Sequence, residues 1–172
     1  MPLTVRYIVA TLVAIEILLA AFAASLAFGQ YNRGDWPHWS DLDRDCQDTR
    51  QEVLIAESVI PPTLDLRGCR VEAGEWLDPS TGNTVTAPSA LDVDHMVPLA
   101  WAYAHGAEAW TRDQRRAYAN SMDDPDHLVA VGLRENRQKG AQGPADWVPP
   151  DVSAHCWYGR AWMRITNSWR LT

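Results

Sequence analysis

Leu91-Asp-Val-Asp-His-Met-Val-Pro-Leu99 is the stretch that decides the fold, and it is read together with a second stretch further along the chain. The second is His127-Leu-Val-Ala-Val131, which leads into Asn136-Arg-Gln-Lys-Gly140. Both contain short runs of β-branched and apolar residues, a pattern typical of strands. Each run carries polar groups at one end: carboxylates and an imidazole on the first, an imidazole, an amide and cations on the second. We therefore expect two strands that bring these groups together.

A helix is expected directly after the second strand. Gly132 turns the chain, and Gly140 is a suitable residue to end the helix. Asn136 and Lys139 are three residues apart and so share one helix face. Lys139 is also the only lysine in a chain that otherwise uses arginine. The order strand, strand, helix therefore places an amide and an ammonium group on a single face.

Asp94 and His95 are adjacent in the first strand, which creates a geometrical requirement. Neighbouring side chains of a regular strand point to opposite faces. If both residues serve one site, the backbone has to bend or bulge at this point. We therefore expect an irregularity at the end of this strand, where Pro98 also stops the pairing.

The remaining segments predict a mixed α+β chain. Thr111-Arg-Asp-Gln114 is a capping-box pattern that marks the start of a helix. Helices are expected over residues 41–58, 99–105, 111–120 and 156–169. The last of these is expected to be capped by Ser153 and to place Trp157 and Met163 in the core. A strand is expected over 69–77, and after a turn the chain returns as its partner strand at 84–86.

The N-terminal segment is a targeting or anchoring sequence. Residues 7–28 are apolar except for Thr11, Glu16 and Ser25, and Arg6 precedes them. A membrane span needs roughly 20 apolar residues, so the length suits either a single span or a long signal peptide. Glu16 is costly in a membrane helix, although the many aliphatic residues can outweigh it. We expect secretion or membrane anchoring through residues 7–28, with the domain outside the cytoplasm; cleavage or retention is left open.

The domain organisation follows from this segment. We expect a signal peptide or anchor at 1–29, a linker at 30–40 and one domain at 41–172.

The net charge of −7 argues against tight, non-specific binding of polyanions by the whole surface. Residues 133–172, however, hold six cationic and three acidic side chains, a net charge of +3, whereas residues 1–132 hold nine and nineteen, a net charge of −10. A cationic face in the C-terminal third is therefore expected.

Three cysteines allow at most one intramolecular bridge. Cys46–Cys69 is the favoured pair, because it would tie the first helix to the following strand, and Cys156 would be left over. Three free thiols are the alternative if the domain is cytoplasmic. The absence of a Cys-x-x-Cys pair makes a zinc ribbon a poor interpretation.

The acidic stretch Asp41, Asp43, Asp45 and Asp48 is similar to the start of a calcium loop. It lacks the central glycine and the terminal bidentate glutamate that such loops use. We therefore expect the solvated N-terminus of a helix.

These motifs resemble the HNH endonuclease superfamily, specifically its Asp-His…Asn branch. That branch includes the HNH domains of CRISPR effector nucleases, GmrSD-type restriction proteins and many exported bacterial HNH proteins. Asp-His-x-x-Pro alone is weak, but it is joined here to Asn-Arg-x-Lys-Gly in the family's order and spacing. The resemblance covers most of the chain after the N-terminal segment, through residues 39–50, 68–76, 92–99, 106–110, 136–140 and 156–158. It implies a ββα-metal core, a two-stranded antiparallel hairpin plus a helix, embedded in additional helices and a short hairpin.

The resemblance also assigns the central chemistry. His95 corresponds to the general base, because a neutral imidazole can take a proton from an attacking water. Asp94 and Asn136 correspond to ligands of one divalent metal ion, with Mg²⁺ preferred because it binds oxygen ligands. Arg137, Lys139 and Arg134 are expected to bind substrate phosphates.

His127 departs from the family pattern, which has an asparagine that braces the loop of the base at this position. The imidazole can serve as the same brace, as part of the catalytic set with His95 and Asn136. Alternatively it can ligate metal, which would shift the preference toward Mn²⁺, Ni²⁺ or Zn²⁺.

The expected function is that of a metal-dependent endonuclease, a hydrolase that cuts the phosphodiester bonds of nucleic acid, with DNA favoured and RNA left open. Two alternatives stay open: a restriction or toxin-type effector domain that requires a partner, and a non-catalytic nucleic-acid-binding module. No protein partner is readable from the sequence. Base preference and oligomeric state are not readable either.

Overall fold

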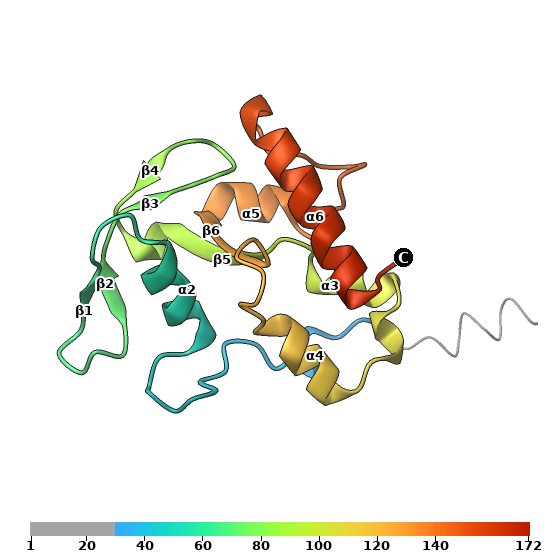
Figure 1. Ribbon diagram of the computed structural model, residues 1–172, viewed down its shortest axis with the longest axis horizontal. Helices are drawn as coiled ribbons and strands as arrows, with labels where there is room; N and C mark the ends of the chain where they lie inside the picture. The colour runs from blue at the N-terminus through green and yellow to red at the C-terminus, as the bar shows by residue number, and fades with distance from the viewer. Residues whose placement is uncertain (1–29) are drawn as a thin grey trace, which may run out of the picture. The chain divides into compact units, whose positions relative to one another are not determined.

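An antiparallel hairpin of two strands lies at the centre of the computed structural model, which describes residues 30–172 (Figure 1). Strand β5 (Leu91–His95) pairs with β6 (Leu128–Gly132). The pairing runs from Leu91 opposite Gly132 to His95 opposite Leu128, residue for residue. Every second side chain of β5 is buried, and β6 is buried over its first four residues. Both strands therefore form where the apolar runs predicted them.

Helix α5 (Leu133–Lys139) follows β6 without a loop. It contacts both strands of the hairpin and ends at Gly140, whose φ of 54° lies in the left-handed region that favours glycine. The predicted order of strand, strand and helix is present. The fold is α+β and is built on small antiparallel hairpins.

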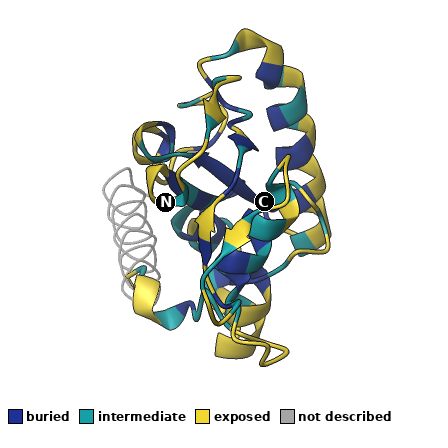
Figure 2. Cartoon of the chain, turned by 90° about the vertical axis from the view of Figure 1, so that its left-hand side faces the viewer, coloured by how far each residue is buried: buried dark blue, intermediate teal, exposed yellow. Residues whose placement is uncertain are grey.

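The hydrophobic core lies between this hairpin and helix α2 (Thr49–Glu57). Two further hairpins border it: β1 (Thr63–Leu64) with β2 (Val71–Ala73), and β3 (Trp76–Leu77) with β4 (Thr84–Val85). Figure 2 shows buried residues gathered on the central strands, with exposed residues on the outer turns. The core residues are Val53, Leu54, Val71, Trp76, Leu91, Val93, Leu128 and Ala130.

The remaining helices are inserted between β5 and β6 or follow α5. Helices α3 (Leu99–Ala104) and α4 (Arg112–Ala119) lie in the insertion, and the long helix α6 (His155–Trp169) ends the fold. The predicted capping box of Thr111 and Gln114 is confirmed at the start of α4. Short 3-10 helices are Arg33–Asp35, Pro88–Ala90, Ala107–Ala109 and Val152–Ala154.

The acidic stretch before α2 is not helical, contrary to the expected helix over 41–58. The side chains of Asp41, Asp43 and Asp45 accept hydrogen bonds from backbone N–H groups two to five residues further on. Such local bonds compete with helical backbone pairing. The helix begins only after Asp48, whose side chain caps it by accepting from the N–H of Gln51.

Two other sequence expectations need correction. The single strand predicted over 69–77 is two separate strands, β2 and β3, which pair with different partners. In α6, Met163 is exposed rather than buried, and the cap of the preceding turn is Asp151, which accepts from the N–H of Ser153.

Residues 32–40 belong to the folded unit, although the sequence predicted a linker over 30–40. Trp36 is buried with 1% exposure, and its ring contacts Trp110 and Tyr118. Trp39 packs against the hydrophobic core. The apolar segment 7–28 and its predicted boundary lie outside the described residues. Within residues 30–172, no helix combines the length and apolar character that crossing a membrane requires.

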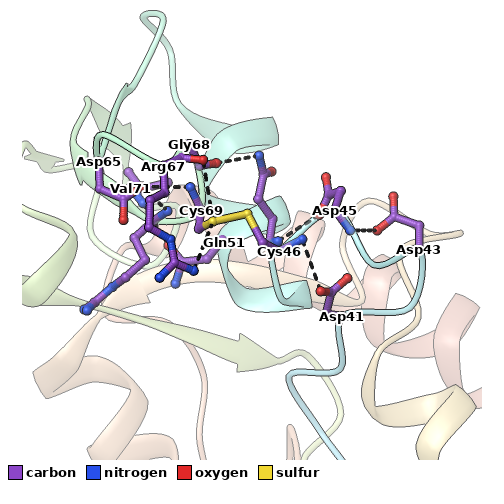
Figure 3. The surroundings of a disulfide bond; sticks show 12 residues. Asp41, Asp43, Asp45, Cys46, Gln51, Asp65, Arg67, Gly68, Cys69 and Val71 are labelled. Atoms are coloured by element: carbon purple, nitrogen blue, oxygen red, sulfur yellow. Dashed lines mark hydrogen bonds between the residues drawn. A yellow bond between two sulfur atoms is a disulfide. The ribbon is translucent and has the colours of Figure 1, made fainter.

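A disulfide joins Cys46 and Cys69, the favoured pair (Figure 3). It connects the acidic stretch to the start of the β2 strand. The loop around Cys69 is held further by Asp65, whose carboxylate accepts from the Cys69 N–H at 2.8 Å. Cys156 is free and exposed.

Candidate functional site

The first half of the candidate site lies on the face of β5 that is turned toward α5. Asp94 projects from β5, and its carboxylate forms an ion pair with the ammonium group of Lys139. The same ammonium donates to the backbone oxygen of His95 at 2.7 Å. Lys139 is 2% exposed. Burial raises the pKa of Asp94 and lowers that of Lys139, and the ion pair opposes both shifts.

Asn136 and Asp92 extend this face. Asp92 and Asp94 are two residues apart in a regular strand and therefore share a side. The side-chain nitrogen of Asn136 donates to a carboxylate oxygen of Asp92 at 2.9 Å. This bond leaves the amide oxygen of Asn136 for a different partner. The two predicted metal ligands, Asp94 and Asn136, thus come from adjacent elements and offer the oxygen donors that Mg²⁺ favours.

His95 occupies the second half of the site, among aromatic rings. Its ring stacks between Trp39, at 5.7 Å between centroids, and Tyr118, at 6.4 Å. Its Nε2 lies 3.0 Å from the backbone oxygen of Ala119. A carbonyl oxygen only accepts hydrogen bonds, so Nε2 carries the hydrogen and Nδ1 of the neutral ring carries a lone pair. Burial, followed by the influence of His127, keeps the pKa of His95 well below its usual value. The neutral form is the one a general base needs.

His127 lies beside His95 and is held in the same way. Its Nε2 lies 2.7 Å from the backbone oxygen of Tyr118, and its ring packs edge-on against Tyr118 and His95. It is 1% exposed, and burial lowers its pKa to about 4. Its Nδ1 is buried and has no hydrogen-bond partner among residues 30–172. The two carbonyl groups at the C-terminal end of α4 thus fix both imidazoles.

The predicted bend between Asp94 and His95 is absent, and this expectation is corrected. The β5–β6 pairing shows no register shift from Leu91 to His95. The two side chains accordingly lie on opposite faces of the hairpin. Burial dominates the pKa of each, raising that of Asp94 and lowering that of His95, and the positive charge of Arg33 makes only a small contribution to both.

The predicted phosphate-binding residues have different environments. Lys139 is buried in its ion pair, so it is not an exposed phosphate ligand, and that expectation is corrected. Arg134 is exposed and pairs with the buried Glu135 at 2.6 Å. Arg137 is exposed and forms no hydrogen bond or ion pair with any described residue. Arg137 is therefore the member of this set that is available to an external phosphate.

One cluster of three potential metal-binding carboxylates occurs in the described part of the chain: Asp41, Asp43 and Asp45. All three are exposed, and each accepts a hydrogen bond from the local backbone. Neither Asp94 nor His127 belongs to any such group within residues 30–172. The predicted ligation of metal by His127 therefore has no carboxylate or imidazole cluster to join.

Sequence reasoning missed the aromatic and cationic residues around His95. Trp39 and Arg33 come from the stretch interpreted as a linker, and Tyr118 comes from the helix predicted over residues 111–120, to which no functional role was given. The unusual number of tryptophans, nine against two phenylalanines, predicts a core and a groove built from large rings, but it does not identify which rings lie at the site. Tyr158, which lines a cavity with Asp94 and Lys139, lay inside a recognised motif without a role.

Comparison with known proteins finds one informative relative. The chain is 38% identical over 143 residues to an "uncharacterized secreted protein" of Arthroderma benhamiae. The match covers 83% of this chain and 68% of the fungal protein. No family model matches the sequence. No solved structure matches it either.

Proposed function

The chain belongs to the family of the secreted Arthroderma benhamiae protein, and we propose that its folded unit is an exported, metal-dependent nuclease of the HNH type. Export is supported by the similarity to a secreted protein, by the apolar segment 7–28 and by the Cys46–Cys69 disulfide. Disulfides form and persist in oxidising compartments outside the cytoplasm.

The observation that carries the proposal is the hairpin followed directly by a helix, with the motif residues joined across it. Asp94 and Lys139 meet between β5 and α5, and Asn136 bonds Asp92 across the same junction. Asp94 and Asn136 are the Asp and Asn of the Asp-His…Asn motif. Its histidine, His95, lies on the opposite face of β5, so the proposal requires the substrate phosphate to be reached from both faces at the end of this strand. Because the Asn136 amide nitrogen is engaged, its oxygen and the Asp94 carboxylate are the two donors suited to one Mg²⁺ ion.

His95 is the proposed general base. Its Nε2–H donates to Ala119, so Nδ1 is the atom that takes a proton from the attacking water. The aromatic rings of Trp39 and Tyr118 hold the imidazole plane. The bound divalent ion would neutralise charge on the phosphate and stabilise the leaving oxygen.

His127 is the proposed brace in place of the family's asparagine. Its Nε2 is engaged with Tyr118, and its ring supports that of His95. This role removes the reason to prefer Zn²⁺ or Ni²⁺ over Mg²⁺. Mn²⁺ remains a suitable substitute because it also accepts oxygen ligands.

The substrate is proposed to be DNA, with RNA as the alternative. Arg137 is an exposed cation on α5, and Arg33 is an exposed cation whose charge has a small effect on Asp94 and His95; both suit contacts with a phosphate backbone. The acidic net charge of the chain implies modest affinity with marked salt dependence.

The test is cleavage of plasmid DNA and of RNA by the purified protein with Mg²⁺ or Mn²⁺. His95→Ala should abolish cutting while the circular dichroism spectrum stays that of wild type. His105→Ala is the matched control, because His105 stacks on Trp101, belongs to none of the motifs and should be dispensable. Equal cutting by wild type and His95→Ala would refute the proposal.

A second candidate is a non-catalytic nucleic-acid-binding module. The burial of His95, which is 5% exposed, and the pairing of Asp94 with Lys139 favour it. It predicts DNA binding without cutting and no binding of Mn²⁺ in calorimetry.

A further inference from the structure

Tyr158 of α6 has a buried hydroxyl group without a hydrogen-bond partner in the described part of the chain. The residue is 3% exposed, so water does not solvate the hydroxyl from the surface. A buried hydroxyl without a partner costs free energy, and proteins rarely leave one unsatisfied. The position of this hydroxyl therefore needs an explanation.

The cavity next to Tyr158 gives one. Its polar lining comes from Ser80, Asp94, Lys139 and Tyr158, and the other lining residues are Met96, Val129, Val131, Trp147 and Trp157. The cavity volume of about 10 Å³ is close to the space that one water molecule needs. Burial raises the pKa of Tyr158, and the negative charge of Asp94, which lines the same cavity, adds a smaller contribution in the same direction.

Among the described residues, the Asp94 carboxylate accepts a side-chain hydrogen bond from Lys139 alone. Lys139 pairs with one of its oxygens, Oδ2. A ligand carboxylate in a metal site is usually hydrogen-bonded by groups that do not touch the metal, and these groups fix its orientation. Tyr158 lines the same cavity as Asp94, its hydroxyl lacks a partner among the described residues, and its ring is buried in the core.

We propose that Tyr158 is a positioning residue for Asp94, and that its hydroxyl donates through a single buried water to the carboxylate that Lys139 holds from the other side. The proposal rests on the proposed function, because Asp94 is the metal ligand there. It assigns α6, which lies outside the hairpin and α5, a direct part in forming the metal site. A positioning role of this kind also gives the buried hydroxyl its missing partner.

Tyr158→Phe is the test, because it removes only the hydroxyl and keeps the ring. We expect Mn²⁺ affinity, measured by calorimetry on the full-length protein, to fall by about tenfold. We also expect the metal-free melting temperature to fall by about 3 °C, since a satisfied hydrogen bond is lost. Ser80→Ala removes the other hydroxyl of the cavity and should leave Mn²⁺ affinity unchanged.

Two results in these variants would overturn the positioning role of Tyr158. Unchanged Mn²⁺ affinity with an equal or higher melting temperature in Tyr158→Phe would show that the hydroxyl is simply unsatisfied, and the proposal would be overturned. Loss of Mn²⁺ affinity in Ser80→Ala, without loss in Tyr158→Phe, would also overturn it.

A metal-free double-mutant cycle separates this inference from the proposed function. Tyr158→Phe and Asp94→Asn are compared singly and together by melting temperature. Non-additive effects mean that the hydroxyl and the carboxylate interact, even if wild-type protein binds no Mn²⁺ and the nuclease proposal fails. Additive effects overturn the positioning role whether or not the protein cuts DNA.

Discussion

Asp94 and Lys139 form a buried ion pair that joins strand β5 to helix α5. The ammonium also donates to the backbone oxygen of His95, so a single lysine binds both the predicted metal ligand and the backbone of the predicted base. The only lysine of the chain is therefore buried and links helix α5 to strand β5. A divalent ion at Asp94 would have to share the carboxylate with it.

The ion pair makes a first prediction about stability. Lys139→Met should lower the free energy of unfolding by about 3–5 kcal/mol, because it leaves a buried carboxylate without its partner. Urea denaturation at pH 7 measures this change. Arg137→Met on the same helix is the control, and it should change stability by less than about 0.5 kcal/mol, because Arg137 is exposed. Equal losses in the two variants would contradict the structural role of Lys139.

The burial of His127 predicts loss of stability in acid. Its pKa is about 4 in the folded state against an ordinary histidine value of 6.5, so the unfolded chain takes up a proton first as pH falls. The contribution of the neutral, buried His127 to the free energy of unfolding is fully present above pH 6.5. It amounts to about 3 kcal/mol and is lost between pH 6.5 and 4. Urea denaturation at a series of pH values over this range should show that the free energy of unfolding depends less on pH in His127→Gln than in wild type.

His105→Gln is the control for the acid slope, since it replaces a histidine that is not buried. It should keep the wild-type dependence on pH. Some slope should persist in His127→Gln, because His95 also has a lowered pKa. An unchanged slope in His127→Gln would mean that His127 does not contribute.

Glu57 predicts the opposite dependence on pH. Its carboxylate accepts from the N–H of Ala130 at 2.8 Å on the open edge of β6, and burial raises its pKa to about 7. The folded state therefore holds a proton that the unfolded state releases above pH 4.5, and stability falls as pH rises from 4.5 to 7. Glu57→Gln keeps an acceptor and removes the charge.

At pH 8, Glu57→Gln should be more stable than wild type by up to about 3 kcal/mol, and at pH 4 the two should be nearly equal. Thermal melts at both pH values test this. Glu72→Gln, at an exposed position of β2, should have little effect at either pH. A destabilised Glu57→Gln at pH 8 would show that the ionised carboxylate is needed.

The elements of this fold were predictable where the apolar pattern was strong. The runs that became β5 and β6 carry β-branched residues with clear boundaries, and α5 follows a glycine and ends at one. The acidic stretch at Asp41–Asp48 was misread because side-chain bonds to the local backbone replaced helical ones. Local competition of this kind has no periodic signature in sequence.

The candidate site was less predictable than the strands that carry it. Motif spacing located Asp94, His95 and Asn136, but it carries no information on which side chains from other segments pack around each of them. Trp39 and Tyr118 reach His95 from segments far away in the chain, and Lys139 is turned inward because Asp94 is there. Such choices depend on tertiary packing.

Arg33 gives a prediction about activity. Its charge makes a small contribution to the pKa of both Asp94 and His95, after the larger effect of burial, although these side chains lie on opposite faces of β5. We expect this exposed guanidinium to bind a substrate phosphate that approaches the two groups. Under the proposed nuclease function, Arg33→Ala should lower kcat/KM for DNA cleavage by roughly 10- to 100-fold, the loss expected for one hydrogen bond to a charged group.

Arg44→Ala is the matched control for Arg33→Ala, because Arg44 is also an exposed arginine but lies in the acidic stretch. It removes the same charge from the surface without touching the site. Cleavage rates over a range of salt concentrations compare the two variants, and the loss in Arg33→Ala should shrink as salt screens the phosphate contact. If both variants lose the same activity at every salt concentration, Arg33 contributes only to the overall charge and has no place at the site.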